Sequence, residues 1–420
     1  KNSISSSYSS NTLASFLSRL EYKFNNRYLL TLNFRADGSS QFGPDKRWGY
    51  FPSGAVAWII TEENFMKDYS NIVSYLKLRG SVGKTGSQNL GAYDWRTLMG
   101  SATYNGAAGI VPSSLGNDIL QWEEQIQKEV GLDYGFWDDR IRGTLGYYQK
   151  KVDNLLYSDP VPTSSSFSSV YQNIGSLKNR GIEFDVRVDI IKNVQKDLTW
   201  NVDFNIARNR TTLEKLNSSD GYFGGGAYDY FKIEEGGETG RFYGYKDAGR
   251  LFMTNEELVG LKTIDPKTGT LKYYRDDYNY ERQGDVYIMD LDGDGQITAD
   301  GDRTVIGNAN PDFFGGFGST LYWKGLMLNA VFSYSVGGDR FWDEEKNSSG
   351  DMNVYNTSNR ILDSWTVNPG VNASYPRAMY YGWGSNSIIT DRYIHDASYL
   401  RMTALNLSYR LPKHLYKNSI

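Results

Sequence analysis

Three aspartates at alternate positions form the clearest metal-binding pattern in the chain. Carboxylates stand at positions one, three and five of a loop, a glycine at position six permits a tight turn, and position seven offers a backbone carbonyl. Position twelve, where a closing carboxylate belongs, is Gly301, with an aspartate on either side. The pattern predicts a bound calcium ion, and the alternative is a solvated turn rich in Asp and Gly. The predicted ligands are Asp290, Asp292, Asp294, Gln296 and, as the closing ligand, Asp302.

The other chemically capable residues form no catalytic pattern. The chain lacks cysteine, which excludes disulfides, thiol nucleophiles and thiolate metal sites. Its two histidines, His395 and His414, are interpreted as surface or membrane-boundary residues. Carboxylates are numerous, but the sequence does not place two of them on either side of one bond. We therefore predict that the protein is not an enzyme, and we name no catalytic residue.

Aromatic residues are over-represented, since 33 Tyr, 19 Phe and 10 Trp make up 15% of the chain. Such rings suit the two boundaries of a bilayer and also surfaces that stack on sugars or peptides. Two aromatic, glycine-rich tracts fall in predicted long loops, where the rings would contact a substrate or a covering partner; the alternative is packing within the loop itself. The candidate residues are Tyr222, Phe223, Tyr228, Tyr230, Tyr381 and Trp383.

The elements that position these residues are predicted to be strands, because apolar and polar residues alternate with a period of two. In residues 182–190 every second residue is apolar and the residues between are charged, and residues 198–206 repeat the alternation with polar residues between. The two segments are expected to pair through a turn at 192–197, and further hairpins are expected at 137–140 and 323–325. The fold class is therefore all-β, with antiparallel strands.

Composition and loop lengths narrow this fold class. The net charge of −4 provides no basic stripe, so no nucleic-acid partner is expected. No run approaches the roughly 18 apolar residues of a helical span, but a transmembrane β-strand needs only about ten alternating residues. Long stretches at 102–120, 160–169, 213–285 and 338–391 alternate with short turns. This one-sided arrangement predicts an antiparallel transmembrane β-barrel with long extracellular loops.

An ordered series of short segments resembles the barrel of SusC/RagA-like TonB-dependent outer-membrane transporters, and the resemblance extends over nearly the whole chain. The segments that carry it are Tyr28–Ser40, Gly49–Ser53, Leu76–Gly86, Gly131–Asp133, Asn179–Glu183, Asp290–Gly295, Asn310–Asp312 and Ser398–Arg401.

The resemblance implies a barrel of about 22 strands in the bacterial outer membrane. It also implies an N-terminal plug, a segment that binds the TonB complex, and a SusD-like surface lipoprotein that covers the barrel. We identify neither a plug nor a TonB-binding segment in residues 1–420, and the chain ends at Ile420 without the aromatic-terminated last strand of such barrels. The chain is therefore interpreted as one domain, a partial outer-membrane β-barrel, with the TonB complex contacting a region that it does not include.

The function that the resemblance implies is TonB-dependent import of nutrients such as oligosaccharides or peptides across the outer membrane. The main alternative is a soluble or surface-attached all-β glycan-binding protein or hydrolase, because alternation and aromatic richness also describe β-sandwiches. A passive porin or adhesin barrel is a third interpretation, but it does not account for the ordered series of segments. Substrate identity and oligomeric state are not encoded in any of these patterns.

Overall fold

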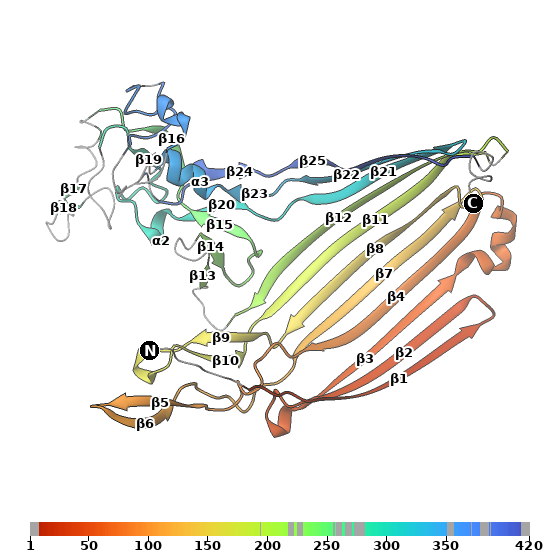
Figure 1. Ribbon diagram of the computed structural model, residues 1–420, viewed down its shortest axis with the longest axis horizontal. Coiled ribbons are helices and arrows are strands. Elements are labelled where there is room, and N and C mark those ends of the chain that lie inside the picture. Colours follow the sequence, from red (N-terminus) through yellow and green to blue (C-terminus); the bar gives the residue numbers. More distant parts are fainter. Residues whose placement is uncertain are drawn as a thin grey trace.

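In the computed structural model, the regular secondary structure of the described residues consists mainly of antiparallel strands (Figure 1). It describes residues 8–193, 195–216, 222–224, 230–254, 257, 263–264, 271–272, 282–350, 357–370, 372–378, 386 and 388–412.

One large sheet contains 11 strands. They lie side by side in the order in which they occur in the chain, and each is hydrogen-bonded to its neighbours. Its strands are β1 (Leu13–Phe24), β2 (Tyr28–Ser39), β3 (Trp48–Ile59), β4 (Val73–Ser87), β7 (Glu123–Phe136), β8 (Ile141–Asp153), β11 (Ser176–Asn193), β12 (Leu198–Lys215), β21 (Phe313–Trp323), β22 (Leu326–Val336) and β25 (Tyr399–Tyr409). The predicted all-β, antiparallel fold class is confirmed.

The alternating apolar and polar residues of the sequence lie on opposite faces of this sheet. Phe184 of β11 pairs with Ile206 of β12 on one face, and Arg187 pairs with Asp203 on the other. Because neighbouring strands keep their side chains in register, the same division continues across the whole sheet. We call the side that carries Phe184 and Val202 the apolar face, and the side that carries Arg187 and Asp203 the polar face.

A β-bulge interrupts the alternation near the turn end of β11. The register shifts between Asp189 and Ile191, so that Ile191 rather than Ile190 pairs with Trp200. Ile190 is therefore the extra residue of the bulge and has no partner in the β11–β12 register, which the period-two pattern did not predict. The period-two pattern does not reveal this extra residue, because Ile190 and Ile191 are both apolar and either could continue the series.

The connections at the two ends of the sheet differ in length, as predicted. Tight turns join β1 to β2, β7 to β8, β11 to β12 and β21 to β22, and they gather at the right of Figure 1. The β3–β4 connection at this end contains 3₁₀ turns at Ile60–Glu62 and Asn64–Tyr69. The opposite end carries every longer excursion of the described chain, including the one between β12 and β21.

Small sheets and short helices build the long-loop end. Their strands are β5 (Met99–Tyr104), β6 (Ala107–Pro112), β9 (Leu156–Pro160), β10 (Ser169–Asn173), β13 (Tyr222–Gly224), β14 (Phe231–Ile233), β15 (Arg241–Gly244), β16 (Asp247–Leu251), β17 (Thr263–Ile264), β18 (Leu271–Lys272), β19 (Val286–Ile288), β20 (Thr304–Asn308), β23 (Asp339–Phe341) and β24 (Ile394–Asp396). The helical segments are α2 (Ala299–Asp302), α3 (Asp343–Glu345), a π-turn at Lys346–Gly350, and 3₁₀ turns at Pro44–Lys46, Thr163–Ser165, Asn359–Asp363 and Asp391–Tyr393. Among the described helices, none is both long and apolar enough to cross a membrane.

The buried apolar cores lie at this loop end, and one of them includes Phe51 of β3, a strand of the large sheet. One core contains Leu251, Phe252, Val286, Ile288 and Ile297. A second core contains Phe42, Phe51, Leu90, Leu120 and Trp122. The apolar face of the sheet instead leaves large side chains such as Val130 and Ile182 more than half exposed. This distribution fits a sheet whose apolar face contacts something other than its own chain.

Candidate functional site

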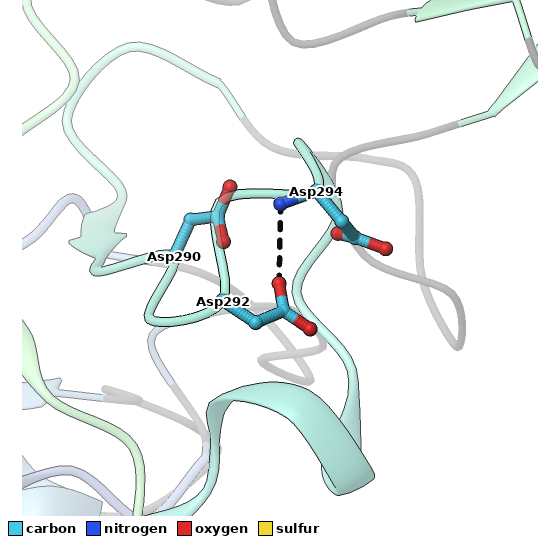
Figure 2. Close-up of side chains that lie close together, drawn as sticks. All are labelled: Asp290, Asp292 and Asp294. Atoms are coloured by element: carbon cyan, nitrogen blue, oxygen red, sulfur yellow. Dashed lines mark hydrogen bonds between the residues drawn. The ribbon is translucent and has the colours of Figure 1, made fainter.

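The predicted metal loop lies between β19 and α2, and the structure brings its three leading carboxylates together. One oxygen from each of Asp290, Asp292 and Asp294 lies within 4.8 Å of the others, at the surface (Figure 2). Two oxygens bound to one calcium ion at about 2.4 Å are at most about 4.8 Å apart, so this spacing fits the ion. Gly293 and Gly295 have φ angles of 76° and 82°, which only glycine adopts without strain.

Backbone N–H groups hold the three carboxylates in place. Asp290 accepts hydrogen bonds from Gly293 N at 2.7 Å and from Gly295 N at 2.8 Å. Asp292 Oδ1 accepts from Asp294 N at 3.1 Å, which is the bond drawn in Figure 2. Each oxygen has two lone pairs, so a carboxylate that accepts an N–H can also bind a cation. The loop is therefore ordered around its carboxylates by its own backbone.

Asp302 lies apart from the three grouped carboxylates and contacts the loop backbone. It is fully buried, and its two oxygens accept hydrogen bonds from Leu291 N and Thr298 N, both at 2.7 Å. Gln296 donates its backbone N–H to Asp294 Oδ1 at 2.8 Å. The structure thus shows Asp302 bracing both ends of the loop, and the ligand roles of Asp302 and Gln296 stay predictions.

A buried ion pair close to this loop joins segments that are far apart in the chain. Asp285, only 2% exposed, contacts Arg377 with an Oδ1–Nε distance of 2.7 Å. It also accepts hydrogen bonds from Asn386 Nδ2 at 2.8 Å and from Arg282 N at 2.8 Å. Burial raises the pKa of Asp285 above its ordinary value, although the Arg377 guanidinium opposes this shift. The network fixes residues 282–285, directly before β19.

The structure describes only part of the predicted aromatic contact surface. Tyr228, Tyr381 and Trp383 lie outside the described residues, and for Tyr222 and Phe223 the structure describes the backbone of β13 alone. The Tyr230 ring stacks on Phe341 with centroids 5.1 Å apart and also lies against Phe231 and Phe242. This packing favours the structural alternative for Tyr230, and the contact role of the other five residues stays a prediction.

The polar face of the large sheet holds a hollow that the sequence analysis did not identify. Its volume is about 510 Å³, and it lies over β4, β7, β8, β11 and β12. Arg79 of β4 lines it and pairs with Glu129 and, at 3.1 Å, with Asp133, both on β7. Residues from the other strands complete the wall, among them Gln127, Tyr148, Lys150, Asn179 and Thr211. The hollow is thus a polar wall lined by both charges, suited to solutes that form hydrogen bonds.

The sequence alone does not predict the hollow, because its residues meet only through strand pairing. Arg79 stands opposite Gly131, and a side chain at Gly131 would place its Cβ about 2.7 Å from the guanidinium carbon. Glu129 and Asp133 lie on either side of that glycine. A glycine between two inward carboxylates is a readable signal once the β4–β7 register is known.

Comparison with known proteins finds one family model and several relatives that match most of the chain. A family model described as TonB dependent receptor-like, beta-barrel matches residues 2–407. The chain is 33% identical over 413 residues to TonB-dependent receptor SusC of Bacteroides thetaiotaomicron, covering 95% of this chain and 38% of that receptor. It is 34% identical over 429 residues to a TonB-dependent receptor of Formosa agariphila, covering 97% and 39%.

Solved structures agree with these relatives. A chain of the RagAB peptide transporter is 27% identical, with a TM-score of 0.76, and the match covers 98% of this chain and 42% of that one. A second structure, the RagAB peptide importer in a closed-closed state, gives 28% identity and a TM-score of 0.75. The chain spans about 40% of the length of the curated relatives it matches.

Proposed function

We propose that the protein of this chain, which belongs to the TonB-dependent receptor-like β-barrel family, imports nutrients across the bacterial outer membrane. The predicted resemblance to SusC/RagA-like transporters is confirmed, and so is the location in the outer membrane. The apolar face is accordingly the lipid-facing side of the barrel wall, and the polar face lines the lumen. The short turns lie on the periplasmic side and the long loops on the extracellular side.

The observation that carries the proposal is the pairing of a continuous apolar face with a polar, hollowed face on the same strands. A solute that moves along the polar face contacts Arg79, Glu129 and Lys150 rather than lipid. Oligosaccharides and peptides, the two substrate classes proposed, both need such donors and acceptors. The RagAB relatives are named as a peptide transporter and importer, which supports the peptide class.

Two protein partners are part of the proposed transport function. A SusD-like surface lipoprotein would cover the long-loop end, and the TonB complex would supply the energy for transport. Transport of this kind makes and breaks no substrate bond, so the chain is proposed not to be an enzyme; its relatives are named receptors and transporters. The competing hydrolase or soluble glycan-binding function would need its apolar face covered by another part of the protein.

Calcium binding at Asp290, Asp292 and Asp294 is a separate part of the proposal. The ion would stiffen the loop between β19 and α2 at the extracellular end, with Gln296 and Asp302 as the remaining predicted ligands. The 4.8 Å grouping of the carboxylate oxygens supports it.

Uptake by cells that carry the full-length protein tests the import proposal. We expect labelled oligosaccharide or peptide uptake to require the protein and to stop when a protonophore removes the energy supply. Lys150→Gln on the polar face should alter uptake, whereas Lys151→Gln on the adjacent residue of the apolar face should not. Full uptake in the presence of protonophore would overturn energy-coupled import, and equal effects of the two variants would overturn the assigned path.

A further inference from the structure

Three exposed cations lie on the apolar face at the end of the sheet nearest the long loops, where the apolar series ends. Lys128 of β7, Arg180 of β11 and Arg208 of β12 are all exposed. Lys128 pairs with Gln149, which in turn pairs with Arg180, so the two cations lie on one row across the strands. Arg208 lies one row closer to the sheet centre, opposite Ile182.

Among the described residues, these three cations differ from their neighbours in having no acidic side chain within ion-pair distance. In the row nearer the loops, Lys84 contacts Glu124 at 2.6 Å and Lys178 contacts Glu214 at 3.2 Å. Within the ranges that the structure describes, no carboxylate lies within ion-pair distance of Lys128, Arg180 or Arg208. Their positive charge is therefore available to a ligand outside the chain.

The position of the three cations corresponds to the outer boundary of the membrane. On β12 the apolar series begins at Leu198 beside the turn and ends where Arg208 takes the next outward position. Ten residues of strand at about 3.4 Å each and a tilt of about 40° give roughly 25 Å along the membrane normal, which is the height of the apolar band of such barrels. The headgroups of the outer leaflet lie at this level.

An apolar groove runs along the same face beside Lys128. Its volume is about 610 Å³, and Leu32, Val56, Val82 and Val130 line it together with Lys128 itself. Gly80 leaves it open, because a Cβ at this position would meet nothing closer than 3.8 Å. A groove of aliphatic side chains that ends at a cation matches an acyl chain that ends at an anionic headgroup.

We propose that this face binds a phosphate-bearing acylated lipid of the outer leaflet. One acyl chain lies in the groove, and the headgroup phosphates contact Lys128, Arg180 and Arg208. The charge complementarity and the continuity with the lipid-facing band both favour a lipid over a second protein. The inference requires the location in the outer membrane but not the import activity.

Lipid binding by the purified full-length protein tests the charge contacts. The probes are fluorescent diphosphoryl lipid A and the same lipid after removal of its phosphates, each titrated in mixed micelles. Binding of the phosphorylated probe should weaken on the order of 100-fold when Lys128, Arg180 and Arg208 all become Gln, since each cation near an anionic headgroup contributes about fivefold. The control Lys67→Gln, Lys192→Gln, Lys196→Gln removes equal charge from the turn end and should bind normally.

Two outcomes would overturn the charge contacts: equal binding of both probes by the wild-type protein, or unchanged binding by the triple variant. If the triple variant does not assemble, Arg180→Gln alone should weaken binding about fivefold, and an unchanged affinity would be equally decisive. Normal nutrient uptake by a variant that has lost lipid binding would separate this inference from the import proposal.

The groove has its own test. Gly80→Val fills the groove and should weaken both lipid probes by the same factor, whereas Gly146→Val, on the polar face with open space around it, should weaken neither. Unchanged binding by Gly80→Val would remove the acyl-chain contact from the proposal.

Discussion

A single charge placed on the apolar face near the middle of the sheet tests the membrane orientation directly. Val202 lies on β12, between Val188 of β11 and Ser319 of β21. It is four residues from Leu198, where the apolar series begins, and six from Arg208, where that series ends. At about 3.4 Å per residue and a tilt of about 40°, Val202 lies roughly 10 Å from one boundary and 15 Å from the other.

The expected cost follows from this depth. An arginine facing lipid near the midplane destabilises a transmembrane barrel by about 2 to 4 kcal/mol, whereas the same residue near a boundary costs about 0 to 1 kcal/mol. Val202→Arg should therefore lower the free energy of unfolding by about 3 kcal/mol. Asn201→Arg adds the same charge on the polar face of the same strand and should cost less than about 1 kcal/mol.

The assay is guanidinium unfolding of the full-length protein in phospholipid vesicles, followed by tryptophan fluorescence. The shift in midpoint, multiplied by the wild-type slope, gives the change in free energy, provided that the variants share that slope. A larger loss for Asn201→Arg than for Val202→Arg would reverse the assigned faces. Equal small losses would mean that neither face contacts lipid.

Three further predictions concern the long-loop end. Calcium at about 100 times its dissociation constant should stabilise the wild-type loop by about 2.7 kcal/mol, which is measured as slower proteolysis between β19 and α2 in calcium than in chelator. Asp292→Ala should abolish this difference, whereas the control Asp300→Ala should keep it. The absence of a calcium effect on the wild-type protein would refute the site. Arg377→Gln should destabilise the same region by about 3 kcal/mol, measured by hydrogen exchange, because it leaves the Asp285 carboxylate buried without its cation; Asp285→Asn should cost less. Since burial raises the pKa of Asp285, the folded loop holds this proton more tightly than the unfolded loop, so the contribution of this group is full below its ordinary pKa and is lost as pH rises through the raised value. Asp285→Asn should remove that part of the pH dependence, and an unchanged slope would contradict the assignment.

The strands and their faces could be predicted because both depend on local pattern. Alternation in residues 182–206 identified β11, β12 and their lipid-facing residues. The turns at 137–140 and 323–325 were located because charged and glycine residues interrupt the alternation there for only a few positions. A period of two specifies direction as well as element, since each side chain points opposite to its neighbour. The ordered family segments then supplied the barrel and the membrane, which no local pattern encodes.

Most of the features that the sequence did not predict depend on pairing between residues far apart in the chain. Arg79 meets Glu129 only because β4 pairs with β7 across an excursion that includes β5 and β6. Asp285 meets Arg377 only after the loops have folded on each other. Asp302 was expected to contact the metal from its spacing alone, but spacing does not show that its two oxygens face Leu291 and Thr298 N–H groups.

The excursion between β12 and β21 leaves the sheet and returns to the adjacent position. Ala207 of β12 pairs with Phe314 of β21, so the chain enters and leaves the excursion at neighbouring points, and the intervening residues contain a core of their own. Lengthening, shortening or exchanging that segment therefore requires no change in strand register. Replacement of one such insert can therefore give the protein a new recognition surface, and so a new substrate, while the strands of the barrel wall stay unchanged.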